Sequence, residues 1–142
     1  MSSVRTVLLV DDDADFVEMN RMLLERNGYS VRVAYSGRQC LEEVSARRPD
    51  IIILDMVMES REDGFEVSRE LRNSEHTKSI PLVMITSAND SIPFHLEPDR
   101  TWLPVDALLE KPVEPQLLLT VVDKALKPHD AQLRQERKAP RG

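Results

Sequence analysis

Cysteine is almost absent from this 142-residue chain, which contains only Cys40. One cysteine cannot form an internal disulfide, so we expect a reducing compartment, the cytoplasm. Long apolar runs are absent as well: none approaches the roughly 20 residues that a membrane-spanning helix needs, and the N-terminus has no signal-peptide pattern. Positive charge is not in excess either. The formal net charge is −6, which argues against generic nucleic-acid binding.

The length and the charge distribution predict one domain and a tail. A chain of 142 residues fits a single domain, which buries roughly two thirds of the surface that the unfolded chain exposes. Residues 127–142 carry five Lys or Arg against two Asp or Glu, so the rest of the chain is strongly acidic. We therefore predict a domain over residues 1–127 and a polar C-terminal tail over residues 128–142.

Short apolar runs alternate along the chain with segments of helical periodicity. This alternation is typical of βα units on a parallel sheet, which places the chain in the α/β class. Strands are expected at residues 5–10, 29–34, 51–54, 81–86 and 107–109. Helices are expected at residues 14–26, 36–47, 65–72 and 115–126.

The segment between the last two expected strands breaks this rhythm. Alternation would place a helix within residues 88–106, but Pro93, Pro98 and Pro104 leave no room for three uninterrupted helical turns. We predict that this segment lacks a regular helix of three turns or more.

Two apolar runs end abruptly in carboxylates. Val7 to Val10 leads directly into Asp11, Asp12 and Asp13, and Ile51 to Leu54 leads directly into Asp55. The carboxyl ends of parallel strands meet at one edge of a sheet, where ligands bind in open α/β folds. Because grouped carboxylates repel one another, a hard divalent cation such as Mg²⁺ is the usual reason for their grouping. The sequence therefore predicts a metal-dependent acidic site.

Two further side chains fall at strand ends. Thr86 offers a hydroxyl at the end of the fourth expected strand, and Lys111 offers a cation after the fifth, directly before Pro112. Both can hold phosphate oxygens, and a carboxylate beside a metal and a lysine can attack phosphorus. Taken singly, each residue has a structural explanation: Asp13 caps a helix, Thr86 is a strand residue and Lys111 is a solvated charge.

Five short motifs together resemble the receiver domain of two-component response regulators, over roughly residues 4–127. In chain order they are Val10-Asp11-Asp12-Asp13, Ile53-Leu54-Asp55-Met56, Asp63-Gly64, Ile85-Thr86-Ser87 and Glu110-Lys111-Pro112-Val113. Each motif alone is common, but five in order at near-family spacing are specific. The resemblance implies a doubly wound, flavodoxin-like fold: a five-stranded parallel sheet in the order 2-1-3-4-5, flanked by helices. The prolines of segment 88–106 predict that the fourth helix of this fold is degenerate here.

The same resemblance implies a role for each site residue. Asp55 would be the phosphoacceptor, and Thr86 and Lys111 would contact the phosphoryl group. The Lys111–Pro112 peptide bond would be cis. The Mg²⁺ ligands would be Asp55, Asp12 directly, Asp11 largely through water, and the backbone carbonyl of Val57.

The chain departs from the family pattern around this site. Glu59 stands where the family usually has a proline, and the Asp63-Gly64 turn comes one residue late. Leu108 stands where the family usually has Tyr or Phe, so an aromatic switch at that position is excluded. Val57 and Ala88 occupy the positions that flank the hydrolytic water in the family, and neither side chain can hydrogen-bond to it. The resemblance thus implies an intact site with an altered readout.

The function implied by the resemblance is a phosphoacceptor module of a two-component phosphorelay, not an enzyme. A histidine kinase or phosphotransfer protein would phosphorylate Asp55, and Mg²⁺-dependent self-phosphorylation and self-dephosphorylation would be the only chemistry. Because the chain ends soon after its last expected helix, we expect no DNA-binding domain, and because it has no long apolar run, we expect no membrane segment. Output would then pass through an unknown downstream protein partner.

Two other functions remain open from the sequence. A pseudo-receiver would act as a scaffold without phosphorylation, which the altered loop after Asp55 favours and the intact acids and lysine disfavour. A haloacid-dehalogenase-type phosphatase would use Asp11 and Asp13 as its Asp-x-Asp motif. That family places Thr two residues after the second Asp, where this chain has Asp15, and its members are longer.

Overall fold

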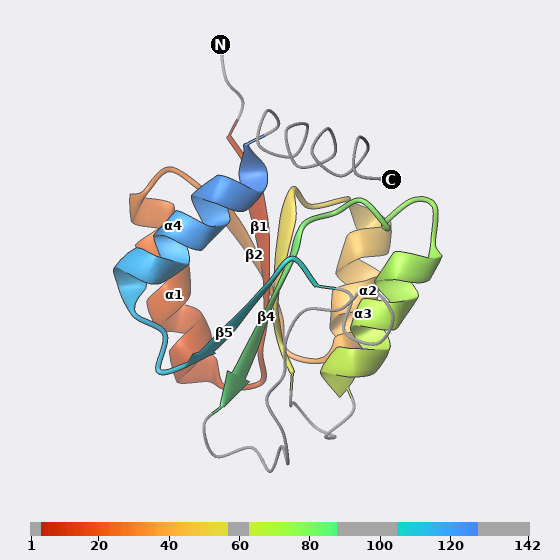
Figure 1. Ribbon diagram of the computed structural model, residues 1–142, viewed down its shortest axis with the longest axis horizontal. Helices are drawn as coiled ribbons and strands as arrows, with labels where there is room; N and C mark the ends of the chain where they lie inside the picture. The colour runs from red at the N-terminus through yellow and green to blue at the C-terminus, as the bar shows by residue number, and fades with distance from the viewer. Residues whose placement is uncertain (1–3, 57–62, 88–104, 128–142) are drawn as a thin grey trace, which may run out of the picture.

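A single five-stranded parallel sheet organises the part of the chain that the computed structural model describes, residues 4–56, 63–87 and 105–127 (Figure 1). Its strands are β1 (Thr6–Val10), β2 (Ser30–Ala34), β3 (Ile51–Asp55), β4 (Leu82–Ser87) and β5 (Ala107–Lys111). The helices are α1 (Ala14–Arg26), α2 (Gly37–Ala46), α3 (Asp63–Asn73) and α4 (Pro115–Leu126). The strand order is β2-β1-β3-β4-β5, which confirms the predicted fold class and places β2 at an edge.

Helices cover both faces of the sheet, with α1 and α4 on one side and α2 and α3 on the other (Figure 1). Successive residues of a strand point to opposite faces, so Ile51 and Ile53 of β3 pack in the α1/α4 layer. Ile52 and Leu54 pack in the α2/α3 layer. All five residues of β3 are buried, which explains why its sequence is continuously apolar and not alternating.

The helix boundaries follow from local chemistry that the sequence displays. The Asp13 side chain accepts hydrogen bonds from the backbone N–H groups of Asp15 and Phe16 and so caps α1. After α1, Gly28 adopts a φ of 94°, a left-handed conformation that glycine adopts without strain. At α4, Glu114 is the N-cap and Pro115 occupies the first turn. These three boundaries confirm the predicted ones.

Ser36 and Gln39 form a capping box at the start of α2, in a shifted form. The backbone N–H of Gln39 donates to Ser36 Oγ at 3.1 Å, as expected. The Gln39 side chain, however, accepts from the backbone N–H of Tyr35 at 2.7 Å, whereas in the standard motif it accepts from the N-cap residue itself. The reciprocal bond therefore reaches one residue further back.

The pair Asp63-Gly64 is not the turn that the sequence predicted, because α3 already begins at Asp63. The Gly64 N–H donates to the Met56 carbonyl at 3.1 Å. A Cβ on Gly64 would lie 2.5 Å from Met56 Cα and 2.7 Å from the Asp55 carbonyl oxygen. Glycine is thus required because the start of α3 lies directly against the backbone at the end of β3.

Three expectations concern residues outside the described ranges. Most of the segment 88–106, the tail 128–142 and residue Val57 belong to the undescribed parts of the chain. The degenerate fourth helix, the domain boundary and the Val57 carbonyl as a Mg²⁺ ligand therefore stay predictions. Within the described ranges, no helix is long and apolar enough to cross a bilayer. Cys40 is fully buried, and burial raises the pKa of its thiol to about 12.

Candidate functional site

The strand register brings the predicted site residues to one edge of the sheet. Asp11 directly follows β1, which pairs with β3 through Val10 and Leu54. Asp55 is the last residue of β3, and Lys111 is the last residue of β5. The strands are parallel, so their carboxyl ends all meet at this edge.

Three carboxylates gather at this edge. One carboxylate oxygen from each of Asp11, Asp12 and Asp55 lies within 4.8 Å of the other two. Asp11 and Asp55 are only 1% and 4% exposed, whereas Asp12 is exposed to solvent. Burial of two neighbouring carboxylates costs free energy unless a cation compensates their charge.

Lys111 supplies part of that compensation. Its Nζ lies 2.9 Å from Asp11 Oδ2 and 4.0 Å from Asp55 Oδ2. Burial of the ammonium disfavours its charge, but the contact with Asp11 and the charges of Asp11, Asp55 and Asp13 outweigh burial and raise the pKa of Lys111. The lysine therefore carries a firmly held positive charge between two buried carboxylates.

The donor set fits a divalent metal ion. Three carboxylates against one ammonium leave two formal negative charges at the cluster. Asp11 Oδ2 is buried, and its contact with Lys111 is an ion pair, since no described donor forms a well-oriented hydrogen bond to it. Buried carboxylate oxygens with unused acceptor capacity are the ligands that hard cations such as Mg²⁺ prefer.

Asp13 stands apart from this set and has a structural role. Its backbone N–H donates to Asp11 Oδ1 at 2.9 Å, and its carboxylate caps α1. The interpretation of Asp13 as a helix cap, made from the sequence, is confirmed. One residue thus joins the start of α1 to the buried carboxylate of Asp11.

Three further features that the sequence singled out are Thr86, Leu108 and the Lys111–Pro112 peptide bond. Thr86 is 8% exposed, and it comes one position after Ile85, the register partner of Asp55. Leu108 is partly buried and packs against the α2/α3 layer of the core, so an aliphatic side chain occupies the position of the aromatic residue usual in the family. The predicted cis peptide bond between Lys111 and Pro112 is present.

One contact at the site was not predicted. Lys111 Nζ lies 4.3 Å from the centroid of the Phe16 ring, on the first turns of α1. From the sequence, Phe16 was only a residue within the helix expected at residues 14–26. The available signal was its position three residues after Asp13, the cap that adjoins Asp11.

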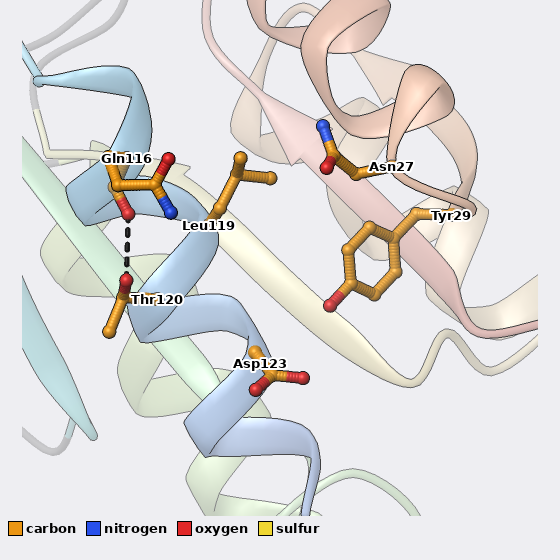
Figure 2. A pocket seen from close by; sticks show the side chains of 6 residues that line it. All are labelled: Asn27, Tyr29, Gln116, Leu119, Thr120 and Asp123. Atoms are coloured by element: carbon orange, nitrogen blue, oxygen red, sulfur yellow. Dashed lines mark hydrogen bonds between the residues drawn. The ribbon is translucent and has the colours of Figure 1, made fainter.

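A cavity of about 280 Å³ lies away from these residues, between α4 and the region where α1 leads into β2 (Figure 2). Its lining is largely polar and consists of Asn27, Tyr29, Gln116, Leu119, Thr120 and Asp123. Figure 2 shows the Tyr29 hydroxyl pointing toward α4. Burial, and then the charge of Asp123, raises the pKa of that hydroxyl. None of the carboxylates of the acidic cluster lines this cavity.

Comparisons with known proteins agree with this geometry. Residues 7–123 match the response regulator receiver domain family. The response regulator MprA of Mycolicibacterium vanbaalenii is 42% identical over 86 residues, which are 61% of this chain and 36% of that protein. MprA of Mycobacterium bovis is 42% identical over 90 residues, 63% of this chain and 37% of that protein. The chain thus covers little more than a third of these relatives.

Solved structures resemble this one over most of its length. The chemotaxis response regulator CheY4 of Vibrio cholerae has a TM-score of 0.73 at 27% identity, covering 87% of this chain and 100% of that chain. The signal receiver domain of a signal transduction histidine kinase from Syntrophus aciditrophicus has a TM-score of 0.74 at 26% identity, covering 87% and 90%. Sheet order, acidic edge and sequence match agree, and the chain belongs to the family of response regulator receiver domains.

Proposed function

We propose that this receiver domain accepts a phosphoryl group on Asp55. One observation carries the proposal: the buried carboxylate of Asp55 lies in a cluster with Asp11 and Asp12, within 4.0 Å of the Lys111 ammonium. A carboxylate at such a place has a cation beside it and further acidic ligands for a second one. Both features neutralise the charge that an incoming phosphoryl group brings.

The donor that fits this acceptor is a phosphohistidine of a histidine kinase or phosphotransfer protein. A carboxylate oxygen of Asp55 attacks phosphorus, and the new P–O bond forms as the P–N bond breaks. The electron pair of the broken bond stays on the imidazole nitrogen of the donor. Lys111 and the Thr86 hydroxyl contact the transferred phosphoryl oxygens. Attack of water on phosphorus later returns the carboxylate and releases inorganic phosphate.

The residues that would hold Mg²⁺ are Asp11, Asp12 and Asp55, together with the backbone carbonyl of Val57. When bound, this ion supplies positive charge that draws the phosphoryl oxygens toward the acceptor. Lys111 supplies a second positive charge from the edge strand β5. Asp11 Oδ1 is held by the Asp13 N–H, which leaves its other oxygen to the cations.

The proposal extends to the setting of the domain. We place it in the cytoplasm, a reducing compartment that fits a chain with one cysteine, and we expect its signal to pass on through a protein partner. Leu108 in place of an aromatic residue supports a readout that differs from the usual rotamer switch.

The test is the intact mass of the protein after incubation with Mg²⁺ and a small phosphodonor such as phosphoramidate. We expect one phosphate adduct on the wild type and none on Asp55→Asn, and omission of Mg²⁺ should suppress the adduct. An undiminished adduct on Asp55→Asn would show that another residue is the acceptor. No adduct on the wild type would favour a scaffold that is not phosphorylated.

A further inference from the structure

Phe16 occupies a special position relative to the lysine of the site. Its ring centroid lies 4.3 Å from Lys111 Nζ, within the range in which an ammonium is attracted by the face of an aromatic ring. The ring is partly buried against the α1/α4 layer of the core. The ammonium therefore has two kinds of neighbour, charged carboxylates and a neutral ring.

The backbone of Phe16 is fixed from both directions along α1. Its N–H donates to the capping carboxylate of Asp13 at 3.2 Å. Its carbonyl accepts a hydrogen bond of 2.8 Å from Nδ2 of Asn20, which is 4% exposed. These bonds fix the backbone from which the ring extends, and the packing of the ring against the α1/α4 layer restricts the side chain, as a ring that positions another group requires.

These contacts form a closed cycle of four residues, Asp11, Asp13, Phe16 and Lys111, two of which belong to the site. Asp11 Oδ1 accepts from the Asp13 N–H, and Asp13 Oδ1 accepts from the Phe16 N–H. The Phe16 ring contacts Lys111 Nζ, which in turn lies 2.9 Å from Asp11 Oδ2. The first turn of α1 therefore connects Asp11 to Lys111, in addition to the direct ion pair between them.

The two kinds of neighbour respond differently when the acceptor changes. A phosphoryl group on Asp55 would compete with Asp11 for the ammonium, because both are anions. The Phe16 ring is neutral and does not compete, yet it still favours a cation over its face. Its attraction persists whichever anion the lysine contacts.

We infer that Phe16 is a positioning residue for Lys111, keeping the ammonium at the site while it passes from Asp11 to the incoming phosphoryl group. This role rests on the proposed function, since it matters only if Asp55 is phosphorylated. It assigns to α1 a part in phosphoryl transfer in addition to its contribution to the core.

The test compares rates of phosphorylation by phosphoramidate at saturating Mg²⁺, followed by intact mass. Phe16→Leu removes the ring and retains an apolar side chain, and we expect the rate to fall about three- to tenfold. Phe16→Tyr retains the ring face and should stay within about twofold of the wild type. Tyr29→Leu is the matched control: this partly buried aromatic packs on the same layer and lines a cavity that none of the three clustered carboxylates lines, so its loss should leave the rate unchanged.

A spectroscopic measurement separates contact from general destabilisation. The Phe16 ring should shift the NMR signals of the Lys111 Cε protons upfield, and Phe16→Leu should abolish that shift while Tyr29→Leu leaves it in place. Equal rates for Phe16→Leu and the wild type would contradict the role of Phe16 and leave the proposed function standing. Failure of Phe16→Tyr to restore the rate, or absence of the upfield shift, would also contradict it. No adduct on any protein would overturn the proposed function, and this role with it.

Discussion

Aspartate has opposite roles at the two ends of the parallel strands, which we call the carboxyl edge and the amino edge of the sheet. At the carboxyl edge, Asp11 and Asp55 are buried beside each other and share one lysine. At the amino edge, Asp50 and Asp106 each precede a strand, β3 and β5 respectively. The amino-edge pair bonds to backbone amides, whereas the carboxyl-edge cluster retains excess negative charge.

The amino-edge aspartates form twin clips between neighbouring strands. The Thr6 N–H donates to Asp50 Oδ2 at 2.7 Å, and the Asp50 N–H donates back to the Thr6 carbonyl at 2.9 Å. Leu82 and Asp106 repeat this arrangement with both distances at 2.7 Å. Arg72 of α3 also pairs with Asp106, at 2.9 Å. Each pair of hydrogen bonds joins the first residue of one strand to the residue that precedes the neighbouring strand of the sheet.

The aspartates at the amino edge therefore serve the stability of the fold, whereas those at the carboxyl edge serve the functional site. A carboxylate whose lone pairs receive backbone N–H donors is satisfied by the fold itself and stabilises it. Carboxylates grouped around a single ammonium repel one another, and a further cation relieves that repulsion. Proteins commonly accept such a cost at a functional site.

Mg²⁺ affinity should show the largest contrast between the two edges. We expect Asp12→Ala to weaken Mg²⁺ binding strongly, by at least about tenfold, because it removes both a ligand and an attracting charge. Asp11→Ala should weaken it less, since this carboxylate already shares its charge with Lys111. Asp106→Ala, which removes a charge at the amino edge, should have little effect.

Isothermal titration of the wild type and these three variants measures the effect. Equal affinity in all four would contradict the assignment of the acidic cluster. Absence of binding to the wild type would favour the pseudo-receiver.

Stability without Mg²⁺ should change with opposite sign at the two edges. Asp50→Ala leaves the part-buried Thr6 N–H without its acceptor, and we expect a loss of about 1–3 kcal/mol. Asp55→Asn removes one charge from a crowded anionic cluster, so we expect a gain of about 1 kcal/mol. Urea denaturation of both variants in the presence of EDTA measures the free energies of unfolding. A loss of similar size in both would refute the distinction.

Most of the fold and of the site was predictable because it rests on short-range patterns. The alternation of apolar runs and helical stripes gave all nine described elements within a few residues at their ends. The positions of Asp11, Asp55 and Lys111 at strand ends brought them to one edge, because parallel strands all end on the same side. Local periodicity and chain direction sufficed for this much.

What the sequence did not reveal depends on contacts between distant segments. The approach of Gly64 to the backbone of Met56 is set by how α3 packs beside β3. The Phe16–Lys111 contact joins α1 to β5, and the Asp50 and Asp106 clips join strands far apart in the chain. No local pattern encodes such pairs, so they required the three-dimensional structure.

Alanine substitutions of two glycines compare the backbone near the carboxyl edge with the backbone near the amino edge. Gly64→Ala places a Cβ 2.5 Å from Met56 Cα, which forces the backbone beside Asp55 to move. We expect a loss of about 2 kcal/mol of stability together with slower phosphorylation. Gly28→Ala, near the amino edge, meets no atom within 4 Å but must adopt a φ of 94°. It should cost only about 1 kcal/mol, with phosphorylation unchanged. Urea denaturation and adduct formation test both, and slower phosphorylation in Gly28→Ala would show that the rate reports stability alone.

The smallest expected effect concerns the lifetime of the phosphorylated state. In the family, the residues two positions after the acceptor and two after the threonine flank the hydrolytic water. Here these are Val57 and Ala88, which lie outside the described ranges. Neither side chain can hydrogen-bond to water, so hydrolysis lacks the advantage of a positioned nucleophile, and we expect slow decay. Ser87 is small and should still admit the phosphoryl group.

The decay rate after removal of the donor tests this, in the wild type and in Val57→Asn/Ala88→Glu. Polar side chains at both positions should orient the water, and we expect decay about three- to tenfold faster. Ala46→Glu at the exposed end of α2 adds the same charge away from the site and should leave the decay rate unchanged. If the double variant decays no faster than the wild type, polar positioning at these residues does not set the lifetime.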